Sequence, residues 1–184
     1  NIFTGRNISV LDEILSIINK YEPAYQNILK YILMSILHLC KITDKHSNSQ
    51  WPLWIPKTDC VEKNIIDIYT KKIKKFYDVI PFMKENYADS QIVESYNMLS
   101  PGKCLLMQKG SQLITEQDIP NNGVDLIITD PPYLEQVLYS EYMQLYKPFL
   151  NLDYNLNDEI IVSSAPSRSK NREDYFHLLD LVFN

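Results

Sequence analysis

Residues 124–137 read VDLIITDPPYLEQV, an apolar run that stops at the tetrapeptide Asp-Pro-Pro-Tyr (130–133). The run 124–129 is largely apolar at successive positions, which is typical of a central strand that is buried on both faces of a sheet. Two consecutive prolines cannot continue such a strand, because each lacks an amide hydrogen and has a fixed φ. The stretch therefore predicts a buried strand that ends in a stiff loop.

In an open α/β sheet, ligands bind at the carboxyl ends of the strands, which is where this loop is expected. Asp130 provides a carboxylate that accepts hydrogen bonds, and Pro131 provides a carbonyl that also accepts them. Pro132 stiffens the loop further, and Tyr133 adds a flat aromatic face. Together the four residues predict a rigid pocket that accepts two hydrogen bonds from one amino group and stacks on the ring that carries it.

The first half of the chain has apolar residues at helical spacing. We expect one helix over residues 8–18 and a second from Pro23 to about residue 42. A third helix is expected over about 60–80, where Pro81 would end or kink it, and a further helical stretch is expected to run to Tyr96. The N-terminal part is therefore predicted to be mainly helical.

The pattern changes at SPGKCLLMQKGS (100–111), where a turn precedes a short apolar run. Residues 103–108 and 124–129 are expected to form strands. Helical spacing returns over 135–150, and a last helix is expected from Glu173 onward. This alternation of strands and helices favours a sheet that is covered by helices.

The length and composition suit a single globular domain, with 184 residues of which 45% are hydrophobic and 22% charged. The expected order of elements gives an α/β fold with a mainly helical part over 1–98 and a sheet-bearing part over 99–184. The chain begins without a methionine and ends within an apolar helical pattern. We therefore expect it to be part of a longer protein.

The net charge is −5, so the chain has no overall positive field, although a local basic face could still bind nucleic acid. The three cysteines, Cys40, Cys60 and Cys104, are widely spaced and form no Cys-x-x-Cys pair. This spacing favours the reduced thiols of a cytoplasmic protein over a disulfide framework or a zinc ribbon. The most apolar segment, 27–40, is too short to cross a bilayer, so no membrane contact is expected.

The sequence TDPPY after the apolar run resembles the catalytic motif of amino-methyltransferases, which have a Rossmann-like fold. These enzymes use S-adenosylmethionine to methylate exocyclic amino groups of bases in DNA or RNA. Looser similarity to bacterial adenine-specific DNA methylases extends over NIFTGRNISVLDEIL (1–15), WPLWIPKTDCVEKNIIDIYTKKIKKF (51–76) and DPPYLEQVLYSEYMQLYKPFL (130–150). The resemblance therefore covers most of the chain, and DPPY is its specific part.

The resemblance implies a role for each residue of the motif. Asp130 and Pro131 would accept the two amino protons, Pro132 would keep the motif rigid, and Tyr133 would stack on a base extruded from the helix. The implied partner is DNA and the expected target is adenine. Two alternatives stay open: an RNA enzyme that acts on guanine in tRNA, and a non-catalytic nucleic-acid-binding module that kept the fold.

The resemblance also implies part of a cofactor site. It places Ser111 and Gln112 near the adenosine of S-adenosylmethionine and counts Asp130 among the cofactor contacts. The glycine-rich loop of Phe-x-Gly-x-Gly type that would pass the methionine part of the cofactor does not occur in the sequence. We therefore expect this chain to hold the base-binding half of the site and only part of the cofactor site.

Substrate contacts are expected in two segments that follow the motif. Ser140 and Glu141 come just after DPPY and are expected to line the substrate channel. The segment SRSKNR (167–172) offers Arg168, Lys170 and Arg172 for contact with backbone phosphates.

Other features have more ordinary interpretations. The basic run 71–75 (KKIKK) is expected to be a solvated helix face, with phosphate contact as the alternative. Trp51 and Trp54 lie in the loop 43–59 and are expected to pack it on the helical part, with base stacking as the alternative.

No metal site is expected. The spacing of the candidate ligands matches no zinc signature; they are His38, Cys40, His46 and Cys60. Arg6 and Asn7 are expected to form a helix cap and a surface pair rather than to bind substrate.

Overall fold

The computed structural model describes residues 2–44, 60–134, 138–151 and 153–183. About half of the chain is helical and a small part is strand, 53% and 7%. The chain divides into two compact units, one formed by Asn1–Phe82 with Tyr139–Tyr154 and the other by Met83–Leu138 with Asn155–Asn184. The chain thus combines helices with short strands, as expected for a mixed fold, and the division into a mainly helical part over 1–98 and a sheet-bearing part over 99–184 stays a prediction.

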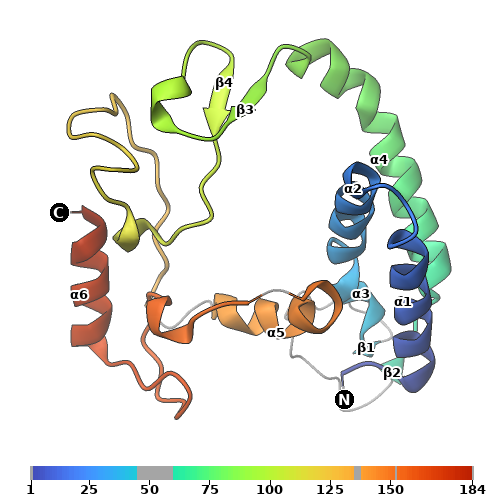
Figure 1. Ribbon diagram of the computed structural model, residues 1–184. Coiled ribbons are helices and arrows are strands. Elements are labelled where there is room, and N and C mark those ends of the chain that lie inside the picture. The colour runs from blue at the N-terminus through green and yellow to red at the C-terminus, as the bar shows by residue number, and fades with distance from the viewer. Residues whose placement is uncertain (1, 45–59, 135–137, 152, 184) are drawn as a thin grey trace. The chain divides into compact units, whose positions relative to one another are not determined.

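The first unit is built mainly from helices, shown in blue, green and orange in Figure 1. Helix α1 begins after Thr4, whose hydroxyl accepts a hydrogen bond from the Asn7 amide at 3.2 Å and so caps the first turn. A small antiparallel ladder joins β1 to β2. The elements of this unit are α1 (Gly5–Ile18), α2 (Pro23–Met34), α3 (Leu37–Cys40), β1 (Thr43–Asp44), β2 (Cys60–Val61), most of α4 (Ile65–Tyr87) and α5 (Tyr139–Leu150).

An apolar core holds the first unit together. The helical spacing predicted for α1 is confirmed, because Leu11 and Ile18 are fully buried on one face of this helix. Helix α5 packs against α1 and α3, and the ring of Phe3 meets that of Phe149 edge to face at 5.5 Å. The fully buried members of this core are Leu11, Ile18, Leu33, Ile36, Leu37, Cys40, Ile65 and Leu145.

Several helix boundaries differ from the sequence prediction, and the helix expected from about residue 60 begins at Ile65, after strand β2. The second helix was expected to continue to about residue 42, but α2 ends at Met34, where the Ser35 hydroxyl donates to the Ile32 carbonyl at 2.7 Å and competes with the helical ladder. Pro81 neither ends nor interrupts α4. The carbonyl that loses its amide partner belongs to Tyr77, which is exposed, so water can satisfy it.

The second unit contains a parallel strand pair and short helices (Figure 1). Strand β3 (Gln91–Val93) pairs in parallel with β4 (Lys103–Leu105). The helical stretch expected up to Tyr96 therefore ends at Tyr87 in α4, and β4 is shorter than the predicted strand. Helix α6 (Arg172–Phe183) agrees with the helix expected from Glu173. Single turns of 3₁₀ helix complete the unit: η1 (Tyr96–Met98), η2 (Ser111–Leu113) and η3 (Leu156–Asp158).

The apolar run 124–129 does not form the predicted buried strand. It is neither helix nor strand, and Leu126, Ile127 and Ile128 are 73%, 76% and 88% exposed. A strand requires neighbours that pair with its backbone, and in the described part of this unit β3 and β4 pair with each other. The Rossmann-like sheet therefore stays a prediction. Within the described ranges, no helix is both long and apolar enough to cross a membrane.

Candidate functional site

The loop 130–133 lies in the second unit, directly after the apolar run 124–129. Asp130 and Tyr133 are exposed, and Pro131 and Pro132 are half-buried. The Tyr133 hydroxyl donates a hydrogen bond to Oδ1 of Asp130. The carboxylate and the tyrosine of the motif are therefore in contact with each other, and the pocket for an amino group stays a prediction.

Two distant residues hold the backbone of this loop. The hydroxyl of Tyr175, on α6, donates to the Pro132 carbonyl at 2.7 Å, and the amide of Val162 donates to the Leu134 carbonyl at 3.2 Å. Leu134 has a φ of 35°, a left-handed conformation that is strained for a branched side chain. Neither Tyr175 nor Val162 was selected from the sequence, since no local pattern relates them to the motif.

Of the two residues expected near the adenosine, Gln112 already makes an internal hydrogen bond and Ser111 is exposed. Gln112 uses its amide to donate to the Asp158 carbonyl at 2.9 Å, and Ser111 is exposed on η2. A separate hollow of about 410 Å³ lies where β3 and β4 end, and its lining includes Glu94, Met107 and Asp118 but, among described residues, neither Ser111 nor Gln112.

This hollow is where an open α/β sheet would place a ligand, and the partial site for S-adenosylmethionine stays a prediction. The glycines of the chain are scattered at Gly5, Gly102, Gly110 and Gly123, so no glycine-rich loop can bring its backbone close to the cofactor. Glu94 was missed at the sequence level because a helix was expected there. A carboxylate directly after a strand would have been the signal.

The three basic residues expected to contact phosphate differ in their surroundings. The Arg168 side chain is 7% exposed and its Nε lies 3.5 Å from Oε2 of Glu159. Lys170 donates to the carbonyls of Leu156 at 3.1 Å and Asn157 at 2.6 Å, and to that of Glu159, and burial lowers its pKa. Arg172 is exposed at the start of α6. Phosphate contact by Arg168 or Lys170 would therefore require internal contacts to break.

A polar loop, residues 163–170, lies in sequence between Val162 and Tyr175, the two residues that hold the backbone of the motif. Ser163 and Lys170 exchange two backbone hydrogen bonds, at 2.8 and 2.9 Å, and so close the loop between them. A hollow of about 560 Å³ lies beside this loop and is lined by Leu138, Val162, Ser163, Ser164, Ser169, Lys170 and Asn171.

The two residues expected in the substrate channel belong to the first unit. Ser140 is 5% exposed and Glu141 is half-buried, both in the first turn of α5. Asp130 and Tyr133 belong to the second unit. The placement of Ser140 and Glu141 in the substrate channel stays a prediction.

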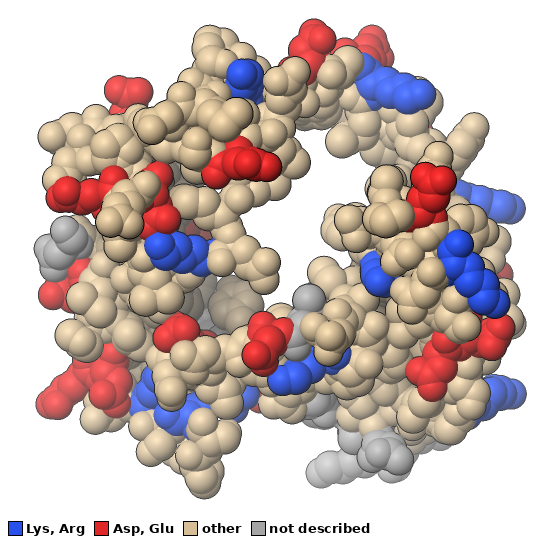
Figure 2. Space-filling model, in the orientation of Figure 1, with Lys and Arg blue, Asp and Glu red and all other residues tan. Residues whose placement is uncertain are grey.

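Charged side chains do not gather into one basic stripe on the described surface that Figure 2 shows. In the run 71–75, Lys71 pairs with Asp67 one helical turn away at 2.7 Å, and both side chains are more than half exposed. This contact is typical of a solvated helix face and contributes a few tenths of a kcal/mol, roughly 0.3–0.5.

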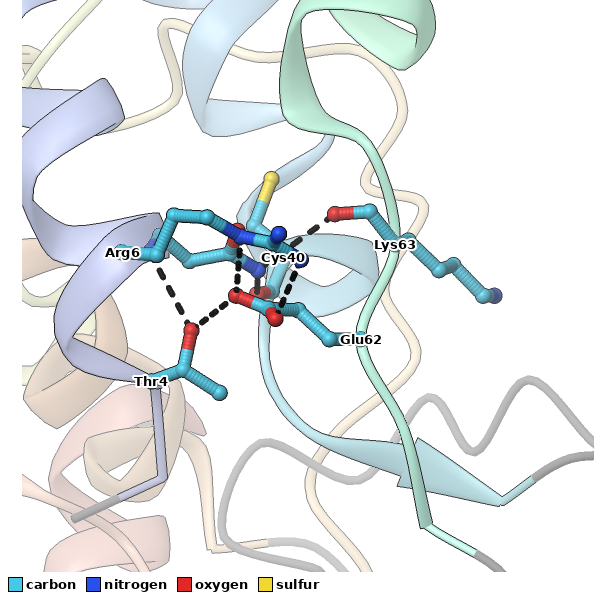
Figure 3. Close-up of polar contacts among 6 residues, drawn as sticks. Thr4, Arg6, Cys40, Glu62 and Lys63 are labelled. Carbon is cyan, nitrogen blue, oxygen red and sulfur yellow. Dashed lines mark hydrogen bonds and ion pairs between the residues drawn. The ribbon is translucent and has the colours of Figure 1, made fainter.

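The FTGRN segment serves the structure of the first unit, as Figure 3 shows. Thr4 and Arg6 donate to the carboxylate of Glu62, and mainly the hydrogen bond from Thr4 holds the pKa of Glu62 below its usual range. Asn7 is buried and donates to the Cys40 carbonyl at 2.9 Å. Thr4 is thus the cap, and Asn7 is a buried structural residue rather than a surface one.

The candidate metal ligands within the described residues, His38, Cys40 and Cys60, do not form a cluster that could hold a metal ion. Burial, followed by the positive charges of Lys41, Lys63 and Lys72, lowers the pKa of His38, and burial raises the pKa of the Cys40 thiol to about 12. Among the described residues, no group of three or more His, Cys, Asp or Glu side chains is placed to hold a metal ion. His46, Trp51 and Trp54 lie outside the described residues.

Comparisons with known proteins found no family model, no curated protein and no solved structure that matches this chain. Inference about function therefore depends on the residues of the loop and on their surroundings.

Proposed function

We propose that this chain carries the base-binding half of a methyltransferase that acts on an exocyclic amino group of a DNA base, with adenine as the expected base. The observation that carries the proposal is the loop 130–133. One carboxylate, one proline carbonyl and one exposed aromatic ring follow each other in a loop whose backbone is anchored at two carbonyl groups.

The chemistry of an aromatic amine explains why such a loop is useful. The nitrogen is a poor nucleophile because its lone pair is delocalised into the ring. Hydrogen bonds from its two protons to the Asp130 carboxylate and the Pro131 carbonyl would favour a tetrahedral nitrogen and return the lone pair to it. S-adenosylmethionine would supply the methyl group, as the resemblance to amino-methyltransferases implies. Holding the amine in one orientation is a large part of catalysis, since effective molarities of oriented groups reach about 10⁵ M or more.

Tyr133 provides the remaining function, which is to hold the base. Tyr133 is 56% exposed, and its ring would stack on the base. Stacking of a base on an aromatic side chain contributes about 1–3 kcal/mol, which offsets part of the cost of unstacking the base from a duplex. An exposed carboxylate beside an exposed aromatic ring suits an amino-bearing ring better than a phosphate.

The binding step can be tested on this chain without the cofactor. A short single-stranded oligonucleotide with one adenine among thymines is titrated into the isotope-labelled protein, and the amide resonance of Tyr133 is followed by NMR. We expect this resonance to shift with the adenine oligonucleotide and not when N6,N6-dimethyladenine, which has no amino protons, replaces adenine. Asp130→Ala should weaken binding about tenfold, as expected for a charge-assisted hydrogen bond.

The controls separate the alternative functions. Oligonucleotides with cytosine or guanine in place of adenine identify the base, and the ribose forms distinguish DNA from RNA. A nucleic-acid-binding module without a base pocket would bind all these probes equally through their phosphates. Equal shifts from the adenine and dimethyladenine oligonucleotides would therefore contradict the proposal.

A further inference from the structure

Tyr175 lies far from the motif in the sequence but contacts its backbone. We propose, on the basis of the function proposed above, that Tyr175 is a positioning residue: by holding the Pro132 carbonyl, it sets the direction of the Tyr133 ring against the base. The observation is the 2.7 Å hydrogen bond from the Tyr175 hydroxyl to the Pro132 carbonyl, across 43 residues of sequence.

The motif itself leaves one place in its backbone open to rotation. The prolines fix φ at residues 131 and 132. A residue that precedes a proline is also restricted to an extended ψ, which applies to Asp130 and to Pro131. The first backbone torsion without such a restriction is therefore ψ of Pro132, which sets the plane of the peptide that leads into Tyr133.

The Tyr175 hydrogen bond acts at this torsion. The direction of the Pro132 carbonyl is determined by ψ of Pro132, so a donor fixed in space beside that oxygen fixes the torsion. On the other side of Tyr133, the Val162 amide holds the Leu134 carbonyl at 3.2 Å and maintains the left-handed backbone of Leu134. The backbone of Tyr133 is thus held on both sides by residues of the later segment 155–184.

Tyr175 is itself well fixed. It is 6% exposed, and a buried phenolic hydroxyl needs a hydrogen-bond partner, which the Pro132 carbonyl provides. It sits in the first turn of α6, where the Asn171 side chain accepts from the amides of Glu173 at 2.7 Å and Asp174 at 3.0 Å. This cap fixes the start of the helix, and hence the place of Tyr175.

Positioning matters because stacking and hydrogen bonding must be satisfied at the same time. A base that donates its amino protons to Asp130 and Pro131 has a fixed plane, and the Tyr133 ring can stack on it only when the two planes are parallel. Rotation about ψ of Pro132 would turn the ring without moving the two acceptors. Loss of the Tyr175 hydroxyl should therefore weaken the stacking contact and leave the acceptors in place.

The test is Tyr175→Phe, which removes one oxygen and keeps the ring. An NMR experiment that correlates the Tyr133 amide with the preceding carbonyl carbon reports directly on Pro132. We expect this carbonyl resonance to move upfield as its hydrogen bond is lost. We also expect the affinity for the single-adenine oligonucleotide to fall about three- to tenfold, with the dispersion of the remaining spectrum unchanged.

Tyr96→Phe is the matched control, since the Tyr96 hydroxyl also donates to a backbone carbonyl of this unit, that of Gly123, at 2.5 Å. A similar loss of stability is expected for both variants, but only Tyr175→Phe should change the Pro132 resonance and the affinity. An unchanged Pro132 resonance, or an unchanged affinity despite a shifted resonance, would overturn this inference alone. If the wild-type protein does not distinguish adenine from dimethyladenine, the proposed function fails and this inference fails with it.

Discussion

The two units of the chain are stabilised by different interactions. In the first unit, helices bury a continuous set of apolar side chains, among them Leu11, Leu33 and Leu145 at 0% exposure. Among the described residues of the second unit, the buried apolar side chains are Val93, Ile161 and Tyr175. The second unit is connected instead by polar contacts between segments that are distant in sequence.

The difference shows that the candidate site is part of the less densely packed unit. Its loop is held by individual hydrogen bonds from Tyr175 and Val162 rather than by a surrounding core. Regions with few buried apolar contacts open at lower free energy than core helices. A residue that supports the site should therefore act locally, whereas a residue of the first core should act on the folding of its whole unit.

The largest effect is expected from Ile32→Ala in the first unit. Ile32 is 2% exposed, and truncating a buried isoleucine to alanine costs about 2–5 kcal/mol through lost contacts and the cavity that remains. The matched control in the second unit is Ile128→Ala, at 88% exposure, which should cost less than about 0.5 kcal/mol. Urea denaturation followed by circular dichroism measures both, and equal costs would contradict the contrast between the units.

A smaller and local effect is expected from Lys170→Met in the second unit. The ammonium group donates to the carbonyls of Leu156, Asn157 and Glu159, and hydrogen bonds from charged groups contribute about 1.5–3 kcal/mol. Hydrogen exchange with mass spectrometry should show faster exchange over residues 155–162 and unchanged exchange in α1. The control is Lys75→Met, on the exposed face of α4, which should leave both regions unchanged.

Asn7→Ala tests whether the first unit also depends on a buried polar contact. The side-chain amide of Asn7 satisfies the Cys40 carbonyl inside the core, and leaving a buried acceptor without a donor costs about 1–3 kcal/mol. Urea denaturation should show this loss for Asn7→Ala but not for Asn19→Ala, since Asn19 is exposed at the end of α1. A cost near zero would show that the apolar contacts alone hold these segments together.

The smallest effect is expected from the pH dependence of the Glu62 contacts. Glu62 has a pKa below its ordinary value of 4.5, first because of the hydrogen bond from Thr4. A lowered folded-state pKa stabilises the fold above pH 4.5, and this contribution is lost as the pH falls through the folded-state pKa. Thermal midpoints between pH 7 and pH 3 should therefore fall less steeply in Glu62→Gln than in the wild type. Glu13→Gln, on the exposed face of α1, should follow the wild type.

What could be predicted from the sequence differs between the two units for a physical reason. The apolar face of α1 repeats at helical spacing within one segment, so local pattern was sufficient. The run 124–129 has the composition of a buried strand, but a strand also needs partners, and composition does not show whether they are present. The break after Met34 and the passage of α4 through Pro81 depend on single hydrogen bonds and on exposure, which periodicity does not encode.

The candidate site shows the same limit. The chemical groups of the loop 130–133 can be read from its four letters, because proline stiffness and the carboxylate are local properties. Tyr175 and Val162 could not be identified, since they contact the loop across 43 and 28 residues of sequence. The internal engagement of Arg168 and Lys170 was also hidden, because a basic loop has the same composition whether its charges face solvent or the protein.

The hydrogen bond from the Tyr133 hydroxyl to Asp130 has a consequence for selectivity. Because this bond occupies Oδ1, a base bound as proposed would have to exchange for the Tyr133 hydroxyl at that oxygen or donate to Oδ2 instead. The two protons of an amino group can satisfy both the Asp130 carboxylate and the Pro131 carbonyl, whereas thymine has a single ring N–H donor and can satisfy only one of these acceptors. Discrimination between bases is a difference of affinities. Here it would arise because the wrong base leaves an acceptor of the loop without a donor. The Tyr133 hydroxyl would thus compete with the base for Oδ1 of Asp130, and an amino-bearing base could displace it.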